Sequence, residues 1–288
     1  MKIAAITMCY KSYDTLRRWH RHYSALIGAE NLYVISHGKD PLHQEIAAGS
    51  SVIALPREDS ERFENRRNTL LGNLQVGLAQ YFDVVLKVDT DELLFHDPAL
   101  FSGFHEVFER NPADGYFALG FEVYQREGDA ALTDAPIASQ RSTGMISFSE
   151  CKGVGANDRA RVVFHGLLPN EPRALHEGRL SVTMPRGLYL AHTKFADFLE
   201  LARANRDRRG ENIELDAEND ALWGSQLNEY RRSDRPVLED ADVHLDAMWQ
   251  RYSTGFGFHR PRRKNILVVK QMRVMRPFRI PDRFRDSF

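Results

Sequence analysis

Three carboxylates stand within four residues at the end of an apolar run, in "VVLKVDTDELLFHD" (84–97). Asp89 and Asp91 are separated by one residue, so both can reach one centre if the strand breaks into a turn there. Carboxylate oxygens suit hard divalent ions such as Mg²⁺ and Mn²⁺, and an ion held by few carboxylates keeps positions that substrate phosphates fill. The spacing predicts a metal site that stabilises a departing diphosphate, against the alternative of a solvated acidic turn.

Other motifs that use closely spaced acids fit this stretch poorly. A calcium-binding EF-hand loop needs an oxygen ligand at its fifth position and glycine at its sixth, where this chain has Leu93 and Leu94. A haloacid-dehalogenase-type phosphatase expects a small residue and then Thr or Val directly after its Asp-x-Asp, near the first strand. No glycine-rich phosphate loop follows the first apolar run, where "CYKSYDT" stands, which argues against ATPases and nicotinamide enzymes.

The elements around the acids alternate between the two periodicities of an α/β sheet. Strands are predicted at 2–10, 31–38, 51–56 and 83–89, and helices at 13–28 and 60–82. For the second helix we expect Ser60 as N-cap and an apolar stripe of Phe63, Leu70, Leu74, Leu78 and Tyr81. In such sheets, ligands sit beyond the carboxyl ends of the strands, which is where Tyr10 and the acids fall.

The pattern changes after a helix-like stretch at 99–110. Short strands separated by turn residues are predicted at 116–125, 144–152, 159–168, 179–185 and 187–195, with helices at 194–209 and 214–232. We therefore predict an α/β fold with a parallel half (1–97) and a mixed, mainly antiparallel half (98–248) in a single domain (1–248). A basic C-terminal tail (249–288) follows.

Composition is that of an ordinary globular protein, with 42% hydrophobic and 27% charged residues in 288. The net charge of −1 argues against a nucleic-acid binder, but the tail holds 11 Lys and Arg against 2 Asp and Glu. Its segment "HRPRRKN" (259–265) suits a membrane surface or a charged acceptor. We predict a cytoplasmic protein, because there are only two cysteines, Cys9 lies in an apolar run, and the sequence has no signal-type stretch and no apolar stretch of 18 residues. Peripheral membrane contact through the tail is an option.

The acidic motif, its strand and the preceding elements resemble the Asp-x-Asp region of GT-A fold glycosyltransferases. The similarity is greatest to the family-2-like group and family 92, and "ITMCYKSYDTLRRWHRHYSALIGAENLYVISHG" resembles that group's opening strand, Trp-containing helix and second strand. The resemblance covers 1–97 well and 98–200 loosely. It implies a GT-A fold and a nucleoside diphosphate sugar donor, with Asp89 near the ribose or metal, Asp91 on a Mn²⁺ or Mg²⁺ ion and Glu92 in support.

Several further residues are candidates for the same site. His192 ends an apolar strand, and because a late histidine completes the metal shell in many GT-A enzymes, the resemblance implies it as third ligand; His165 is its competitor. Arg66 and Arg67, early in the 60–82 helix, could bind diphosphate or a base edge, although a solvated face also explains them and is the favoured interpretation. Tyr10 falls where the resembling fold seats the nucleoside.

An inverting transferase also needs a carboxylate base to deprotonate the acceptor hydroxyl. Glu122, Glu150 and Asp158 are the candidates, and the sequence does not single one out; a retaining mechanism would need none in that role. The resulting hypothesis is a glycosyltransferase acting on a glycan or lipid-linked acceptor. The alternatives are a nucleotidyltransferase acting on a sugar phosphate and a degenerate protein that binds a glycan or a partner.

Overall fold

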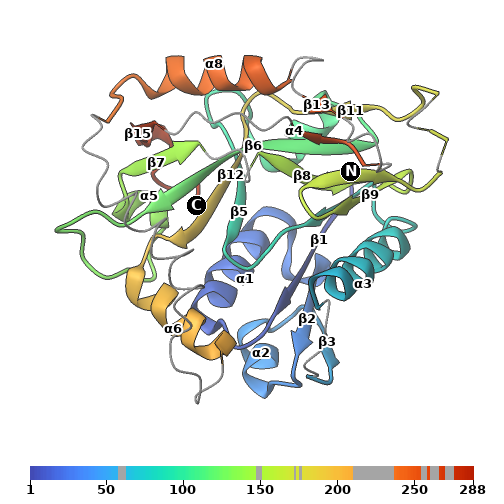
Figure 1. Cartoon of the computed structure of the whole chain (residues 1–288), viewed down its shortest axis with the longest axis horizontal. Helices are drawn as coiled ribbons and strands as arrows, with labels where there is room; N and C mark the ends of the chain where they lie inside the picture. Colours follow the sequence, from blue (N-terminus) through green and yellow to red (C-terminus); the bar gives the residue numbers. More distant parts are fainter. Residues whose placement is uncertain are drawn as a thin grey trace.

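The parallel half forms the lower part of the molecule in Figure 1. A computed structural model describes residues 1–57, 63–146, 151–171, 173–174, 177–209, 237–253, 258–259, 266–269 and 276–288. The first elements are β1 (Ile3–Cys9), α1 (Tyr13–Ile27), η1 (Ala29–Asn31), β2 (Leu32–His37), α2 (Pro41–Ile46), β3 (Ser51–Leu55), α3 (Phe63–Leu78) and β4 (Val84–Lys87). Strands β4, β1, β2 and β3 lie side by side in this order, and all of them run parallel.

Helices cover both faces of these strands, because every residue of β1 is buried and its side chains alternate between the faces. On one face, Ile3 and Ala5 share a core cluster with Trp19 and Tyr23 of α1. On the other face, Ala4 and Ile6 share a cluster with Leu71 of α3. The carboxyl ends of the four strands are thereby left as a common edge between two helical layers.

A mixed half continues from the end of β4. Its elements are β5 (Glu92–His96), α4 (Phe104–Arg110), β6 (Gly115–Tyr124), α5 (Ile137–Gln140), β7 (Thr143–Ile146), β8 (Lys152–Ala156), β9 (Ala160–Val163), β10 (Gly166–Pro169), β11 (Val182–Thr183), β12 (Leu188–Phe195), α6 (Phe198–Arg209), α8 (Ala241–Ser253), β13 (Phe258–His259), β14 (Val268–Val269), β15 (Pro277–Arg279) and η2 (Asp282–Phe284). The main sheet has the order β15-β7-β6-β8-β4-β1-β2-β3. In it, β8 pairs antiparallel with both β4 and β6, while β12 lies parallel to β6 and antiparallel to β5.

The predicted α/β class, a parallel half joined to a mixed and largely antiparallel half, is confirmed. The single strand predicted at 159–168 is wrong, because Phe164 and His165 form a tight turn between two antiparallel strands, β9 and β10. The strand predicted at 144–152 is also two strands, β7 and β8, around residues outside the described ranges. Strand β5, directly after the acids, was not predicted.

The apolar stripe predicted for α3 is confirmed in part, because Phe63, Leu74 and Leu78 are partly buried against the core cluster of Ala4 and Ile6, but Leu70 and Tyr81 are exposed. Their exposed fractions are 38% and 79%, whereas the buried side of α3 is made by Asn68, Leu71, Gly72 and Gln75. This face carries amides because polar groups lie opposite it: Gln75 donates to the Val85 carbonyl, and Asn68 accepts from a lysine of β4. The predicted Ser60 cap and the 214–232 helix lie outside the described residues.

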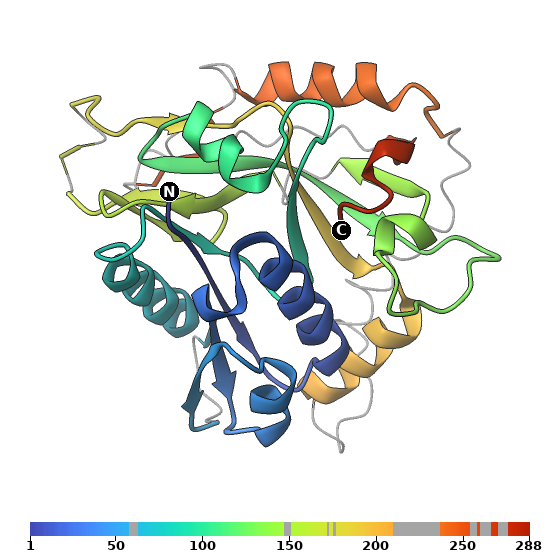
Figure 2. The same cartoon turned by 180° about the vertical axis from the view of Figure 1, so that it is seen from behind.

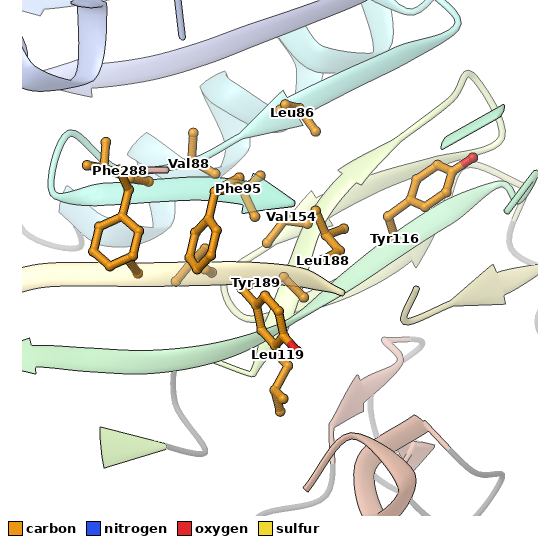
Figure 3. Close-up of a cluster of buried hydrophobic side chains, with 14 of the residues drawn as sticks. Leu86, Val88, Phe95, Tyr116, Leu119, Val154, Leu188, Tyr189 and Phe288 are labelled. Atoms are coloured by element: carbon orange, nitrogen blue, oxygen red, sulfur yellow. The ribbon is translucent and has the colours of Figure 1, made fainter. Parts of the chain in front are cut away.

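The C-terminal residues belong to the core of the mixed half. Phe288 packs on Phe95 of β5 with ring centroids 4.7 Å apart, and Tyr189 of β12 lies 5.5 Å from the same ring (Figure 3). Strand β15 extends the main sheet beside β7. The expected boundary between domain and tail at 248/249 falls inside α8, which lies across the side of the molecule opposite β3 and α2 (Figures 1 and 2).

The basic segment "HRPRRKN" lies outside the described residues except for His259. Within the described ranges, no helix combines the length and the apolarity that crossing a membrane requires.

Candidate metal site

The chain turns sharply between β4 and β5, and this turn carries the acidic cluster. The Asp89 N–H donates to the Glu92 carboxylate at 2.9 Å, and the Glu92 N–H donates to the Asp89 carbonyl at 3.0 Å. Both the N–H and the hydroxyl of Thr193 donate to the Asp91 carbonyl, at 2.7 and 2.9 Å. The turn is therefore fixed by its own groups and by the end of β12.

Sheet register brings His192 between two glutamates. In β12, His192 lies opposite Glu92 of β5 on one side and opposite Glu122 of β6 on the other. Directly paired residues project from the same face of a sheet. Three titratable side chains from three different strands therefore line up in a row.

One nitrogen of the His192 ring is committed to Glu122. Nδ1 lies 2.8 Å from the Glu122 Oε2, and Nε2 lies 3.5 Å from the Asp91 Oδ2. Glu122 is buried and is an acceptor when ionised, so its carboxylate favours the tautomer with the proton on Nδ1. Nε2, the ring nitrogen nearer to Asp91, then carries the lone pair, and a carboxylate on the other nitrogen is the usual orienting partner of a metal-binding histidine.

Asp91, Glu92 and His192 form a group whose ligand atoms all lie within 4.8 Å of one another. Two carboxylates and an imidazole are a suitable donor set for Mn²⁺. The Glu92 carboxylate has other contacts too, because one oxygen accepts the Asp89 N–H and the other forms a buried ion pair with Lys152 of β8. Lys152 thus places a positive charge beside Glu92.

Asp89, the other predicted metal ligand, pairs with Arg67 of α3. Burial raises the pKa of Asp89, but the charges of Arg67 and Lys152 outweigh it and hold this pKa below its usual value. The Asp89 carboxylate is therefore ionised at neutral pH, with a guanidinium beside it at the edge of the sheet.

Aromatic and cationic groups gather at the neighbouring strand ends. Tyr10 follows β1, and the Arg57 guanidinium lies 3.4 Å from the centroid of its ring. His37, at the end of β2, stacks on Phe63 with centroids 5.1 Å apart and meets the edge of Tyr10 at 6.2 Å. Flat side chains at this edge can contact the face of a base, and the guanidinium can contact an anion.

The structure brings Asp89, Asp91, His192, Glu122 and Arg67 together, and Tyr10 lies at the adjacent strand end. Other predicted residues lie elsewhere. Arg66 is exposed on α3, and Asp158 is exposed after the far end of β8, where Ala156 pairs with Val85 near the start of β4. Glu150 lies outside the described residues, and His165 is exposed in the turn between β9 and β10.

Residues that the sequence did not single out also contribute to the site. Lys152 stands in a stretch of β8 without any recognisable motif. Lys87 of β4 donates to the Asn68 amide oxygen at 2.7 Å and to the Val162 carbonyl at 3.1 Å. Burial, followed by the Arg67 charge, lowers the pKa of Lys87 to about 8. Lys87 could have been found from the sequence, because it is a charged residue inside an apolar strand and such a residue needs a buried partner.

No protein-family model matches the chain, and no curated protein matches it either. Among solved structures, a mannose-1-phosphate geranyltransferase from Thermus thermophilus is 13% identical over 73% of this chain and 61% of its own, with a TM-score of 0.32. The chain thus spans less than two thirds of that protein.

Two more solved structures are similar at the same level. A CMP:2-keto-3-deoxy-manno-octonic acid synthetase complexed with CTP is 13% identical over 73% of this chain and 100% of its own, with a TM-score of 0.31. A 4-diphosphocytidyl-2C-methyl-D-erythritol synthase is 17% identical over 44% and 65%, with a TM-score of 0.28. At these values the likeness assigns neither a family nor an activity to this chain.

Proposed function

We propose that this protein is a metal-dependent glycosyltransferase of GT-A type that uses a nucleoside diphosphate sugar. One observation carries the proposal: His192, held at Nδ1 by Glu122, directs Nε2 toward Asp91 at the carboxyl edge of the parallel strands. Asp91 and His192 would hold Mn²⁺ or Mg²⁺, with Glu92 as the nearest further carboxylate. The ion would neutralise the diphosphate and stabilise it as a leaving group.

The remaining residues would bind and orient the donor. Tyr10 and His37 would contact the nucleoside at the ends of β1 and β2. The pair of Asp89 and Arg67 follows β4, the strand next to β1, where Asp89 could accept from a ribose hydroxyl and Arg67 could donate to a phosphate oxygen. Glu122 would keep His192 in place, which makes it a positioning residue in this proposal and not the base that activates the acceptor.

A nucleotidyltransferase acting on a sugar phosphate is the second reading, and one of the similar structures is a synthetase solved with CTP. Such enzymes usually hold the triphosphate on a Gly- and Lys/Arg-rich loop after the first strand. In this chain β1 ends at Cys9 and α1 begins at Tyr13, and Lys11 and Ser12 between them have φ of 51° and 52°. We rank glycosyl transfer first because this short turn leaves no such loop.

Calorimetry with a panel of nucleoside diphosphate sugars, with and without Mn²⁺, tests the proposal. We expect at least one donor to bind the native protein in a Mn²⁺-dependent way. Asp91→Asn keeps the size of the side chain but removes its charge, and it should weaken this binding by at least about tenfold. Asp158→Asn changes an exposed carboxylate at the far end of β8 and should leave the binding unchanged.

Two outcomes would overturn the proposal. One is that no nucleoside diphosphate sugar binds, and the other is that binding ignores both Mn²⁺ and Asp91→Asn. Release of pyrophosphate from CTP or ATP in the presence of a sugar phosphate would establish the nucleotidyltransferase instead.

A further inference from the structure

The turn between β9 and β10 presents an aromatic side chain to solvent from a strained backbone. Phe164 has a φ of 52°, in the left-handed region, and its side chain is 47% exposed. Bulky L-residues seldom adopt this conformation, which glycine or asparagine adopts readily. Burial does not compensate for the strain, because the residue as a whole is exposed. A feature of this kind suggests a function for the side chain.

The strained turn is held in place on both sides. The Phe164 N–H donates to the Asn68 amide oxygen at 3.0 Å, and the same oxygen accepts from Lys87 at 2.7 Å. The carbonyl of His165 accepts the N–H of Gly153 at 3.1 Å. The ring is therefore presented from a fixed backbone, so a ligand that contacts it would need little ordering of the protein.

These two contacts place the turn beside the acidic cluster. Asn68 follows Arg67, which bonds Asp89, and Gly153 follows Lys152, which bonds Glu92. Along the edge of the sheet the strands follow the order β2, β1, β4, β8. Tyr10 follows β1 and His37 ends β2, whereas the turn is tied to β8. The turn that carries Phe164 is therefore tied to the strand on the opposite side of β4 from β1 and β2.

We propose that Phe164 is the platform on which a sugar ring of the acceptor packs. This inference rests on the proposed function, because the acceptor side is defined by the donor site at Tyr10. One face of a pyranose ring carries C–H groups, and these pack on the face of an aromatic ring through apolar and weak C–H contacts. The ligand class is thus a neutral saccharide, which would pack on the exposed phenyl ring.

Saturation-transfer NMR with the methyl glycosides of glucose, galactose, mannose and N-acetylglucosamine tests the platform directly. We expect at least one of them to bind the native protein and Phe164→Ala to weaken this binding by about fivefold or more. Phe164→Tyr keeps a flat ring and should retain it. Tyr81→Ala removes a 79% exposed aromatic just beyond the end of α3 and serves as the matched control. Binding of nucleoside diphosphate sugars with Mn²⁺ should be the same in all variants.

The platform is overturned if none of the four glycosides binds the native protein, or if Phe164→Ala binds them as the native protein does. A loss of nucleoside diphosphate sugar affinity in Phe164→Ala would also overturn it, since the ring would then serve the donor. Phe164→Asn, which suits the left-handed backbone, repeats the removal of the ring in a turn that is relieved of strain, so a loss of binding in both variants cannot be due to a misfolded turn. If glycosides depend on Phe164 while no nucleotide sugar binds, the platform stands and the proposed function fails.

Discussion

At the scale of single residues, the contact between Glu122 and His192 determines which nitrogen of the imidazole faces the acidic turn. A histidine beside an acidic turn has two nitrogens to offer, and either could face the acids. Because Glu122 lies 2.8 Å from Nδ1, the nitrogen that faces Asp91 is Nε2. The sequence named both residues, but Glu122 was predicted as a candidate base, since a sequence does not show that it lies opposite His192 in the sheet.

Replacing Glu122 by Gln should weaken Mn²⁺ binding by about tenfold or more, the effect usual for a residue that orients a metal ligand. The amide keeps the size of the side chain, so the melting temperature should change far less than it does for Glu122→Ala. Titration of Mn²⁺, followed by its electron paramagnetic resonance signal, measures the affinity directly. Unchanged affinity in Glu122→Gln would show that His192 needs no orienting charge, and Glu106→Gln, on the surface of α4, is the control.

At the scale of elements, α1 is fastened to the strand that follows the acids. The Tyr23 hydroxyl donates to the Glu92 carbonyl at 3.1 Å and accepts the Leu94 N–H at 2.8 Å. His22 Nε2 donates to the Leu94 carbonyl at 2.7 Å. Burial lowers the pKa of His22 to about 4, although the hydrogen bond opposes this effect. Helix α1 and β5 are thus joined by a histidine that is neutral at physiological pH.

The His22 pKa predicts how stability depends on pH. Between about pH 6.5 and pH 4 the unfolded chain binds a proton at this residue and the folded chain does not, so the free energy of unfolding should fall as the pH falls. His22→Gln, whose amide can also donate to Leu94, should reduce this fall by about 1 to 3 kcal/mol. Urea unfolding of both proteins at pH 7 and pH 5 measures the difference. If the free energy of unfolding falls by the same amount between the two pH values in both proteins, the prediction is contradicted.

Many of the helices and strands could be predicted, because the local periodicity of apolar residues indicates them. The strand–helix alternation of 1–97 and the long β6 are examples, since each has either a continuous apolar run or a helical repeat. The buried face of α3 could not be predicted, because its amides are matched to Lys87 and to backbone groups of other strands. Lys152 was missed for the same reason: its partner Glu92 lies 60 residues away, and only the pairing of the strands brings the two together.

At the scale of the whole molecule, the last residues fill the core of the mixed half. Phe284 is fully buried, with its ring 5.1 Å from that of Phe95 and 5.3 Å from that of Tyr189. Arg283 beside it forms ion pairs with Asp97 and Asp242, which follow β5 and lie in α8. The described part of the predicted tail is therefore a structural element that stabilises the strands behind the candidate site.

Phe284→Ala should lower the free energy of unfolding by about 3 to 5 kcal/mol, because it removes a large buried ring and leaves a cavity. Tyr81→Ala should change it by less than about 0.5 kcal/mol, since Tyr81 is exposed. Chemical denaturation of both variants gives the comparison. A small effect of Phe284→Ala would mean that the neighbouring aromatic rings can close over the vacated space.

The hydrogen bonds between the acidic turn and β12 also determine when the candidate site can form during synthesis. Thr193 reaches Asp91 across 102 residues, and His192 reaches Glu122 across 70. As the chain leaves the ribosome, the carboxylates emerge long before the histidine does, and closing so long a loop is a late and slow event. A nascent chain shorter than about two thirds of this sequence would carry the acids without their imidazole, so the candidate site should be completed only after the parallel half has folded.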